Sequence, residues 1–134
     1  MSPSLDPLPR HFQREELVLR QQGISQWEQL AVLSDHELRQ LASRGGALER
    51  QLRKLRGQAR LVSELNLQPH EAALLLYAGI ASSHGLAQAS PQQLLTQLGR
   101  LERSLTGMAP ARVEAATVRD WISRAQRFIS RSRN

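Results

Sequence analysis

The chain contains no cysteine, and no apolar run in it is long enough to cross a membrane. Without cysteine it can form neither disulfide bonds nor thiolate metal sites, which is compatible with an intracellular protein. The longest apolar run, residues 72–81, is too short for a bilayer, and residues 1–10 lack the apolar core of a signal peptide. We therefore expect a soluble, cytoplasmic protein with no membrane segment.

Aromatic residues are scarce, at 4% of the chain, whereas apolar residues make up 40%. Leu, Ala, Gln and Arg are frequent and runs of β-branched residues are few, a composition that favours helices over strands. A chain of 134 residues is long enough for one domain, or for two small ones that share a core. The composition predicts an all-α protein.

Basic residues exceed acidic ones, and nearly all of them are arginine. The chain has 18 Lys and Arg against 12 Asp and Glu, a formal net charge of +6, and Lys54 is its only lysine. A basic protein is a plausible partner for polyanions, because neutralising phosphates releases counterions whatever the nucleotide sequence. The charge indicates a class of partner and carries no information on the fold.

Two segments of the sequence follow one plan. Residues 17–41 align without a gap with residues 73–97, and each segment reads as a helix, a Gly-Ile turn, a short helix, a Ser cap and a further helix. The identities are Leu19/Leu75, Gly23/Gly79, Ile24/Ile80, Leu30/Leu86, Ala31/Ala87, Ser34/Ser90 and Leu38/Leu94. We expect tandem repeats packed into one compact helical domain.

Glycine and serine mark the predicted helix boundaries. Gly23 and Gly79 suit the left-handed position that follows a helix, so that Gly23-Ile24 and Gly79-Ile80 are predicted structural turns. Pro91 suits the first position of a helix. The predicted caps are Ser25 with Glu28, Ser34 with Glu37, Ser90 with Gln93, and Thr117.

The repeats also predict the domain organisation. Residues 71–79 are apolar on nearly all sides, so we expect this helix to lie sandwiched between the repeats in one joined core. The predicted parts are a flexible N-terminal tail (1–8), repeat 1 (9–66), repeat 2 (67–128) and a basic C-terminal tail (129–134).

Residues 47–65 predict an amphipathic helix with cations along its back. Its apolar stripe consists of Leu48, Leu52, Leu55, Ala59 and Val62. The last helix shows the same separation of apolar and basic sides. Guanidinium groups form paired hydrogen bonds with phosphate oxygens, so both basic faces are candidate nucleic-acid surfaces; the alternative is two solvated faces that only aid solubility. The predicted nucleic-acid-binding residues are Arg50, Arg53, Lys54, Arg56, Arg60, Arg124, Arg127 and Arg131.

Most of the aromatic residues are expected in the core. Trp121 and Phe128 fall on the apolar stripe of the last helix, and Tyr77 falls in an apolar helix. Trp27 stands near the start of a short helix, where it can be exposed. We therefore predict Trp27 as a stacking or partner-contact residue.

Residues 34–36 read Ser-Asp-His, the residue types of a hydrolase triad. Adjacent residues cannot hold the geometry of such a triad, and Ser34 is already predicted to cap a helix. The sequence has no Gly-rich phosphate loop, paired acid site or metal-ligand spacing. We expect no enzyme activity, no metal and no cofactor.

The segments "AGIASSHGLAQASPQQLLTQL", residues 78–98, and "VRDWISRAQ", residues 118–126, resemble a bacterial, often cyanobacterial, domain-of-unknown-function family related to helix-hairpin-helix modules. The resemblance is best over residues 71–127, and the first repeat looks like a diverged copy. It implies a compact helical fold, related to domains that often contact DNA through backbone amides at a hairpin turn. Such hairpins usually carry two glycines, whereas each turn here has one, which moves the search for function to the arginine-backed helices.

The leading hypothesis is a non-enzymatic helical module that binds nucleic acid, DNA or RNA, with low sequence specificity. An alternative is a protein adaptor or small subunit of a larger assembly, in which Trp27 and the basic faces meet an acidic partner. Pairing of amphipathic helices between copies of the chain is a third possibility, and the sequence leaves the oligomeric state open.

Overall fold

Every regular element in the described part of the chain is a helix, as the composition predicts. The computed structural model describes residues 4–5, 8–106 and 113–132. In these ranges the only extended pairing is an isolated bridge between Ser4 and Gln26. The prediction of an all-α protein is therefore confirmed for the described residues.

The same succession of helices occurs in both halves. Each half has a nine-residue helix, a five-residue helix and then two further helices, of which the last is the longest in its half. The first half consists of η1 (Arg10–Phe12), α1 (Gln13–Gln21), α2 (Trp27–Ala31), α3 (Asp35–Ser43) and α4 (Glu49–Leu65). The second half consists of α5 (Pro69–Tyr77), α6 (Ser83–Ala87), α7 (Pro91–Thr106) and α8 (Ala115–Ser132).

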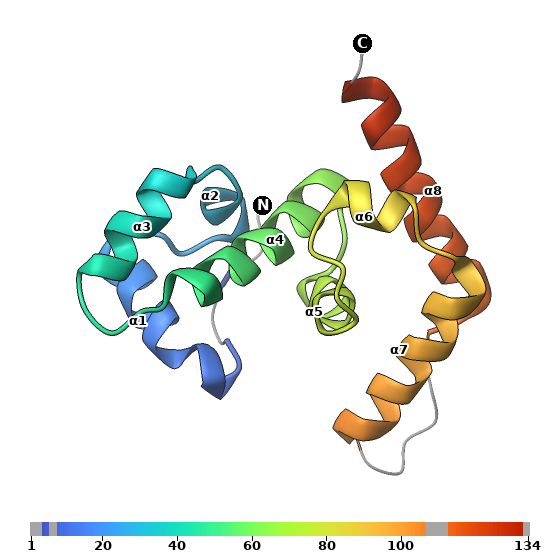
Figure 1. Cartoon of the computed structure of the whole chain (residues 1–134), viewed down its shortest axis with the longest axis horizontal. Helices are drawn as coiled ribbons and strands as arrows, with labels where there is room; N and C mark the ends of the chain where they lie inside the picture. The colour runs from blue at the N-terminus through green and yellow to red at the C-terminus, as the bar shows by residue number, and fades with distance from the viewer. Residues whose placement is uncertain (1–3, 6–7, 107–112, 133–134) are drawn as a thin grey trace.

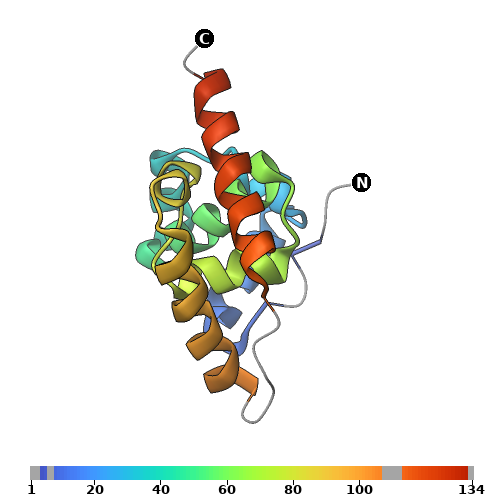
Figure 2. The same cartoon turned by 90° about the vertical axis from the view of Figure 1, so that its right-hand side faces the viewer.

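Helix α4 runs through the middle of the molecule and joins the two halves (Figure 1). In the first half α2 and α3 pack on α4, and in the second half α6 and α7 pack on α8 in the same way. Helix α4 also packs against α5, α6 and α8. The view along the second half shows α8 crossing in front of the other helices (Figure 2). Because α4 serves both halves, they share one core.

The buried position of α4 differs from the sequence prediction. Residues 55–59 are all buried, and because five residues exceed one helical turn, the middle of α4 is covered on every side. Helix α5, which was expected to be sandwiched, is fully buried only at Ala72 and Leu75, and its Tyr77 is exposed. Helix α5 packs against α4 of the first half and α7 of the second, so it lies between helices of both halves as expected, although it is less buried than the middle of α4.

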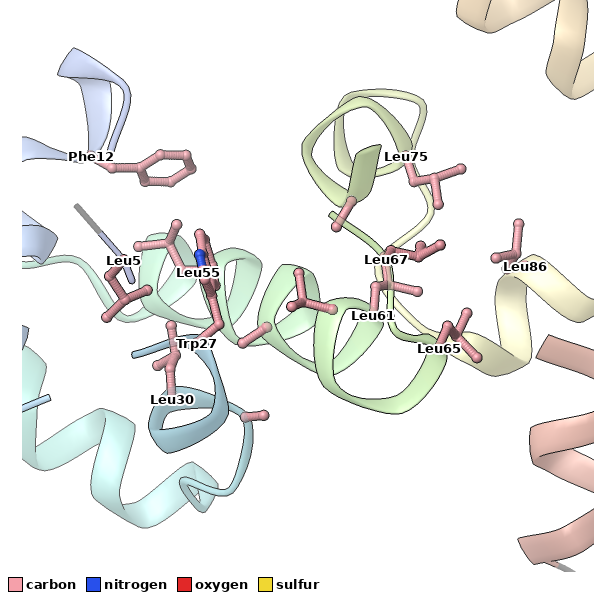
Figure 3. Packing of buried hydrophobic residues seen from close by; sticks show 14 of the residues in the cluster. Leu5, Phe12, Trp27, Leu30, Leu55, Leu61, Leu65, Leu67, Leu75 and Leu86 are labelled. Carbon is pink, nitrogen blue, oxygen red and sulfur yellow. The ribbon is translucent and has the colours of Figure 1, made fainter. Parts of the chain in front are cut away.

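Figure 3 shows how side chains from both halves meet along α4. Leu55 faces Trp27 of α2 at one end, and Leu61 lies towards Leu67 and Leu75 at the other. All of these residues belong to one cluster of buried apolar side chains. The prediction of one joined core is confirmed.

The two Gly-Ile turns have the predicted backbone. Gly23 has φ +78° and Gly79 has φ +88°, both in the left-handed region that glycine adopts without strain. Ser34 caps α3, with its Oγ 3.1 Å from the N–H of Glu37 that donates to it. Ser90 Oγ accepts at 3.4 Å from the N–H of Gln93, and Pro91 opens α7, as predicted.

Two predicted caps are wrong. Helix α2 is capped by Gln26 and Gln29, because Gln29 Oε1 accepts from the N–H of Ser25 at 2.8 Å and from that of Gln26 at 3.0 Å. The longer Gln side chain thus takes the role that was assigned to Ser25 and Glu28. Thr117 lies inside α8, which already begins at Ala115.

Parts of both predicted tails are ordered. Leu5 is buried, and its N–H donates to Ser25 O at 2.9 Å, so this part of residues 1–8 packs on the loop between α1 and α2. Helix α8 continues to Ser132, so residues 129–132 are helical. Residues 1–3, 6–7, 107–112 and 133–134 lie outside the described residues.

Candidate functional site

Two of the predicted nucleic-acid-binding arginines are bonded to backbone carbonyls at and after the end of α2. Arg56 is only 8% exposed, and its Nη1 donates to Leu33 O at 3.0 Å. Arg60 Nε donates at 3.3 Å to Ala31 O at the end of α2. A helix end leaves carbonyl groups without intrahelical donors, and here guanidinium groups supply them. The placement of Arg56 on an outer basic face is therefore wrong, and Arg60 is half-buried with its guanidinium group bonded within the fold.

Asp35, the first residue of α3, binds two arginines of α4. Its Oδ1 lies 2.7 Å from Nη2 of Arg56 and 3.3 Å from Nη1 of Arg53. The hydrogen bond from Arg56 and the charge of Arg53 lower the pKa of the Asp35 carboxyl. Arg53 also pairs with Glu49 at 2.8 Å, and this hydrogen bond raises the pKa of Arg53. The sequence placed only Glu49 beside these cations, because Asp35 is distant along the chain.

Arg124 has a structural partner as well. Its Nη1 donates to Leu65 O at 3.2 Å and to Asn66 O at 3.4 Å, and its Nε lies 2.8 Å from Oδ2 of Asp120. These bonds fasten α8 to the C-terminal end of α4, where Asn66 has φ +56°. Arg124 thus joins the two halves.

Five of the predicted cations remain exposed: Arg50, Arg53 and Lys54 on α4, and Arg127 and Arg131 on α8. Arg53 pairs with Asp35 and Glu49, whereas the other four form no ion pair with another described residue. The first turns of α4 and the last turns of α8 lie at different ends of the molecule (Figure 1). The structure therefore does not bring the predicted residues together into one surface.

Another group of cations surrounds the loop between α3 and α4. Arg44 follows α3, Arg50 lies in the first turn of α4, and Arg14 of α1 reaches this loop, with its Cδ 3.9 Å from the position of a Cβ on Gly46. All three are exposed. We call Arg14, Arg44 and Arg50 the loop-end cations. Sequence reasoning missed Arg14 and Arg44; the "SRGG" segment just before a basic helix was the available signal for Arg44.

The acids nearest to the loop-end cations are already bonded. Glu15 is buried, and its Oε2 accepts at 2.9 Å from the N–H of Leu48, the residue before α4. A carboxylate at a helix N-terminus is favoured by the free amides and the helix dipole. Glu49 pairs with Arg53, as described above. The surface at this loop is consequently basic.

A groove of about 520 Å³ lies beside the loop-end cations. It runs between η1 and α1 on one side and the first turns of α4 on the other. Leu17 and Leu48 are 53% and 46% exposed along it. Its lining residues are Arg10, His11, Gln13, Arg14, Glu15, Leu17, Leu48 and Gln51.

The amides of both Gly-Ile turns are occupied. Gly23 N–H donates to Arg20 O at 3.0 Å, and Gly79 N–H donates to Leu76 O at 3.0 Å. The N–H groups of Ile24 and Ile80 donate, each at 2.9 Å, to carbonyls of the preceding helix. These turn amides close the end of their own helix, so they are not available to a phosphate.

Trp27 is buried, so the prediction that it is an exposed contact residue is wrong. Its side chain is 2% exposed and lies among Leu5, Phe12 and Leu55 (Figure 3). The Nε1–H group has no hydrogen-bond partner among the described residues. Its burial depends on Leu5, from a segment that the sequence predicts to be a flexible tail.

Tyr77 is the exposed aromatic residue. Its hydroxyl lies 3.5 Å from Nε2 of His11, which connects α5 to the start of the first half. Partial burial raises the pKa of Tyr77. The prediction that Tyr77 belongs to the core is wrong, whereas Trp121 is buried as expected and Phe128 packs against the core.

Ser34 and Asp35 of the Ser-Asp-His segment have structural roles at the start of α3. Ser34 caps α3, and its N–H donates to Glu37 Oε1 at 3.0 Å, a bond that lowers the pKa of Glu37. Asp35 binds the arginines of α4, and His36 is exposed. Within the described ranges, His, Asp and Glu residues do not gather into a group that could hold a metal ion. No described helix combines the length and apolar character needed to span a bilayer.

Comparison with known proteins places the chain in a family. No curated protein and no solved structure matches it. The model of a domain of unknown function, DUF4332, matches residues 9–128. This match includes the first half as well as the second, and the two halves share the core built around α4. The chain therefore belongs to the DUF4332 family.

Proposed function

We propose that the chain is a non-enzymatic, cytoplasmic helical module that binds DNA or RNA weakly and with little sequence preference. The observation that carries this proposal is the exposure of the loop-end cations around one loop. Glu15 and Glu49, the nearby acids, accept bonds from within the fold. A phosphate backbone bound at this loop would release counterions, which favours binding at low salt.

The proposed binding residues differ from those that the sequence indicates. Arg50 and Lys54 remain, and Arg14 and Arg44 are added. Arg53 and the other cations with internal partners are left out, because a guanidinium group bonded within the fold would have to leave its partner to bind phosphate.

We also infer that the α1–α2 and α5–α6 hairpins are related to helix-hairpin-helix modules. The support is the Gly-Ile turn at the same place in both halves, each with a left-handed glycine. Phosphate binding by the turn amides is no part of this inference, since these amides donate to carbonyls of their own helix.

A fluorescence titration with labelled single-stranded and duplex DNA and RNA tests the nucleic-acid proposal. Binding at low ionic strength should weaken as salt is added, with a log–log slope that reflects the number of phosphates neutralised. The R44Q/R50Q variant should lower that slope by roughly one for each lost contact. R127Q/R131Q, which removes the same charge at the other end, is the matched control and should change it less. Absence of salt-dependent binding would overturn the proposal.

A protein partner is the second candidate function, favoured by the exposure of Leu17 and Leu48 beside arginines. A phosphate backbone gains little from exposed leucines, whereas protein interfaces bury such side chains. Affinity purification with and without nuclease separates the candidates. Partners lost after nuclease treatment support nucleic-acid binding, and a stoichiometric protein that remains supports the adaptor.

A further inference from the structure

We infer that the groove between α1 and the first turns of α4 binds an acidic amphipathic helix of a partner protein. This inference rests on the second candidate function, protein binding, and gives it a site and a partner chemistry. It shares Arg14 with the nucleic-acid proposal, but Leu17 and Leu48 belong to the groove alone and Arg44 and Arg50 to the nucleic-acid surface alone, so variants of these residues test the two proposals separately.

The first support is the position of the exposed apolar side chains. Four large apolar residues are exposed in the described part of the chain: Leu17, Val32, Leu48 and Tyr77. Leu17 and Leu48 line the same groove although they are distant in sequence. Large exposed apolar side chains that meet at one hollow, beside polar residues, are typical of a protein interaction site.

The second support is the charge around the groove. Arg10 and Arg14 line it, are exposed and form no ion pair with another described residue. Glu15 is the one acidic lining residue, and its carboxylate is buried against the Leu48 N–H. The groove therefore presents apolar and positively charged groups, which complement leucine and glutamate on a partner and repel a basic one.

The third support is that the groove is already formed. Phe12 is buried and holds η1 against the core, and the Glu15–Leu48 hydrogen bond fixes α1 to the beginning of α4. Walls made of helices keep their spacing, so binding needs little ordering of the receptor. A groove of this kind accepts an amphipathic helix through anchors at positions i, i+3, i+4 and i+7.

The probe is a fluorescein-labelled amphipathic peptide of roughly four helical turns, with leucines at the anchor positions and glutamates on the other face. Anisotropy is measured with the full chain. One control peptide has lysine in place of glutamate, and another has serine in place of leucine. We expect only the peptide with both leucine and glutamate to bind. In NMR spectra of the protein, its addition should change the backbone amide chemical shifts of α1 and the start of α4.

Variants of the protein locate the site. L17S/L48S should weaken binding of the acidic peptide at least tenfold, and R10Q/R14Q should weaken it and reduce its salt dependence. V32S is the matched control, because Val32 is 77% exposed but lies outside the groove, and it should leave binding unchanged. All substituted side chains are exposed, and circular dichroism and melting temperature verify that each variant folds.

Several results would overturn the inference. The first is that the acidic peptide does not bind at low salt, and the second is that the serine control peptide binds as tightly as the acidic peptide. The others are that V32S weakens peptide binding as much as L17S/L48S does, or that the protein's amide chemical shifts change away from the groove. Concentration-dependent sedimentation that L17S/L48S abolishes would assign the groove to a second copy of the chain instead.

Nucleic-acid binding is measured on the same variants to keep the two proposals separate. L17S/L48S should retain DNA and RNA binding, and R44Q/R50Q should retain peptide binding. If the wild-type protein binds nucleic acid but not the acidic peptide, the groove inference is contradicted and the nucleic-acid proposal stands. If the wild-type protein binds the acidic peptide but neither DNA nor RNA, the leading proposed function is contradicted and the groove inference stands.

Discussion

Arg56 of α4 and Asp35 of α3 form an ion pair of 2.7 Å that fixes the start of α3 against the central helix. The same guanidinium group donates to Leu33 O in the loop before α3. One side chain therefore satisfies a carboxylate and a backbone carbonyl from a neighbouring segment. A residue that the sequence indicates as part of a binding face is instead a tie between helices.

Replacing Arg56 with methionine should lower the free energy of unfolding by about 1–3 kcal/mol, because Leu33 O and Asp35 lose a partly buried donor. Urea or thermal unfolding followed by circular dichroism measures the change. R50M is the matched control on an exposed position of the same helix, and it should stay within about 0.5 kcal/mol of the wild type. Equal effects of the two substitutions would contradict the structural role of Arg56.

The ion pair also predicts a dependence of stability on pH. Arg56 and Arg53 lower the pKa of Asp35 below its ordinary value of 3.8, so its charged form stabilises the fold above that value. This contribution should be lost as the pH falls through the lowered pKa. In unfolding measurements from neutral to acidic pH, D35N should be less stable at pH 7 and should lose less stability in acid. E114Q, at an exposed carboxylate that forms no ion pair with another described residue, is the control and should change stability at pH 7 less than D35N does.

A larger residue at Gly57 should push α4 away from the turn that contains Ala81 in the second half. A Cβ at this position of α4 would lie 2.8 Å from Ala81 O and 2.9 Å from Ala81 Cβ, closer than packed atoms allow. G57A should lower the free energy of unfolding by about 1–2 kcal/mol, because overpacking outweighs the gain in helix propensity. S63A, on an exposed residue of α4, should show no such loss. The double variant G57A/A81G should recover part of it, since it removes one of the two contacts.

The two left-handed glycines offer a test of the repeated turn. Nothing lies within 4 Å of a Cβ built on Gly23 or Gly79, so an alanine there meets only backbone strain. G23A and G79A should each lower the free energy of unfolding by about 1–2 kcal/mol. G23N and G79N should cost less, because asparagine tolerates this conformation. A large difference between the two sites in chemical denaturation would argue against equivalent turns.

Burial of Trp27 predicts the fluorescence of the protein. Both tryptophans, Trp27 and Trp121, are buried. Their emission should be blue-shifted and resist quenching by acrylamide, and unfolding should reverse both properties. Addition of nucleic acid or of the acidic peptide should leave the emission maximum unchanged. A readily quenched tryptophan in the folded protein would restore Trp27 as an exposed contact residue.

Local sequence signals predicted the helices and turns well. Gly23, Gly79, Ser34 and Pro91 act within a few residues of themselves, through backbone conformation and capping, so their effect can be deduced from neighbouring residues. The exceptions are caps where a longer side chain competes. Gln29 reaches back to cap α2, a role for which the sequence favoured Ser25 with Glu28.

Contacts between distant segments could not be predicted in this way. The carboxylate that binds Arg56 comes from α3, and the carbonyls that bind Arg124 come from the end of α4. Helical periodicity places a cation on one face but does not reveal which segment covers that face. For the same reason Trp27 was expected at the surface, since Leu5 and Phe12 cover it from the N-terminal side.

The close approach of Gly57 to Ala81 has a consequence for cooperativity. Helices of both halves pack on α4, so unfolding of either half would expose apolar side chains of α4 that belong to the shared core. Unfolding should therefore proceed as one transition, and neither half should fold as an independent unit.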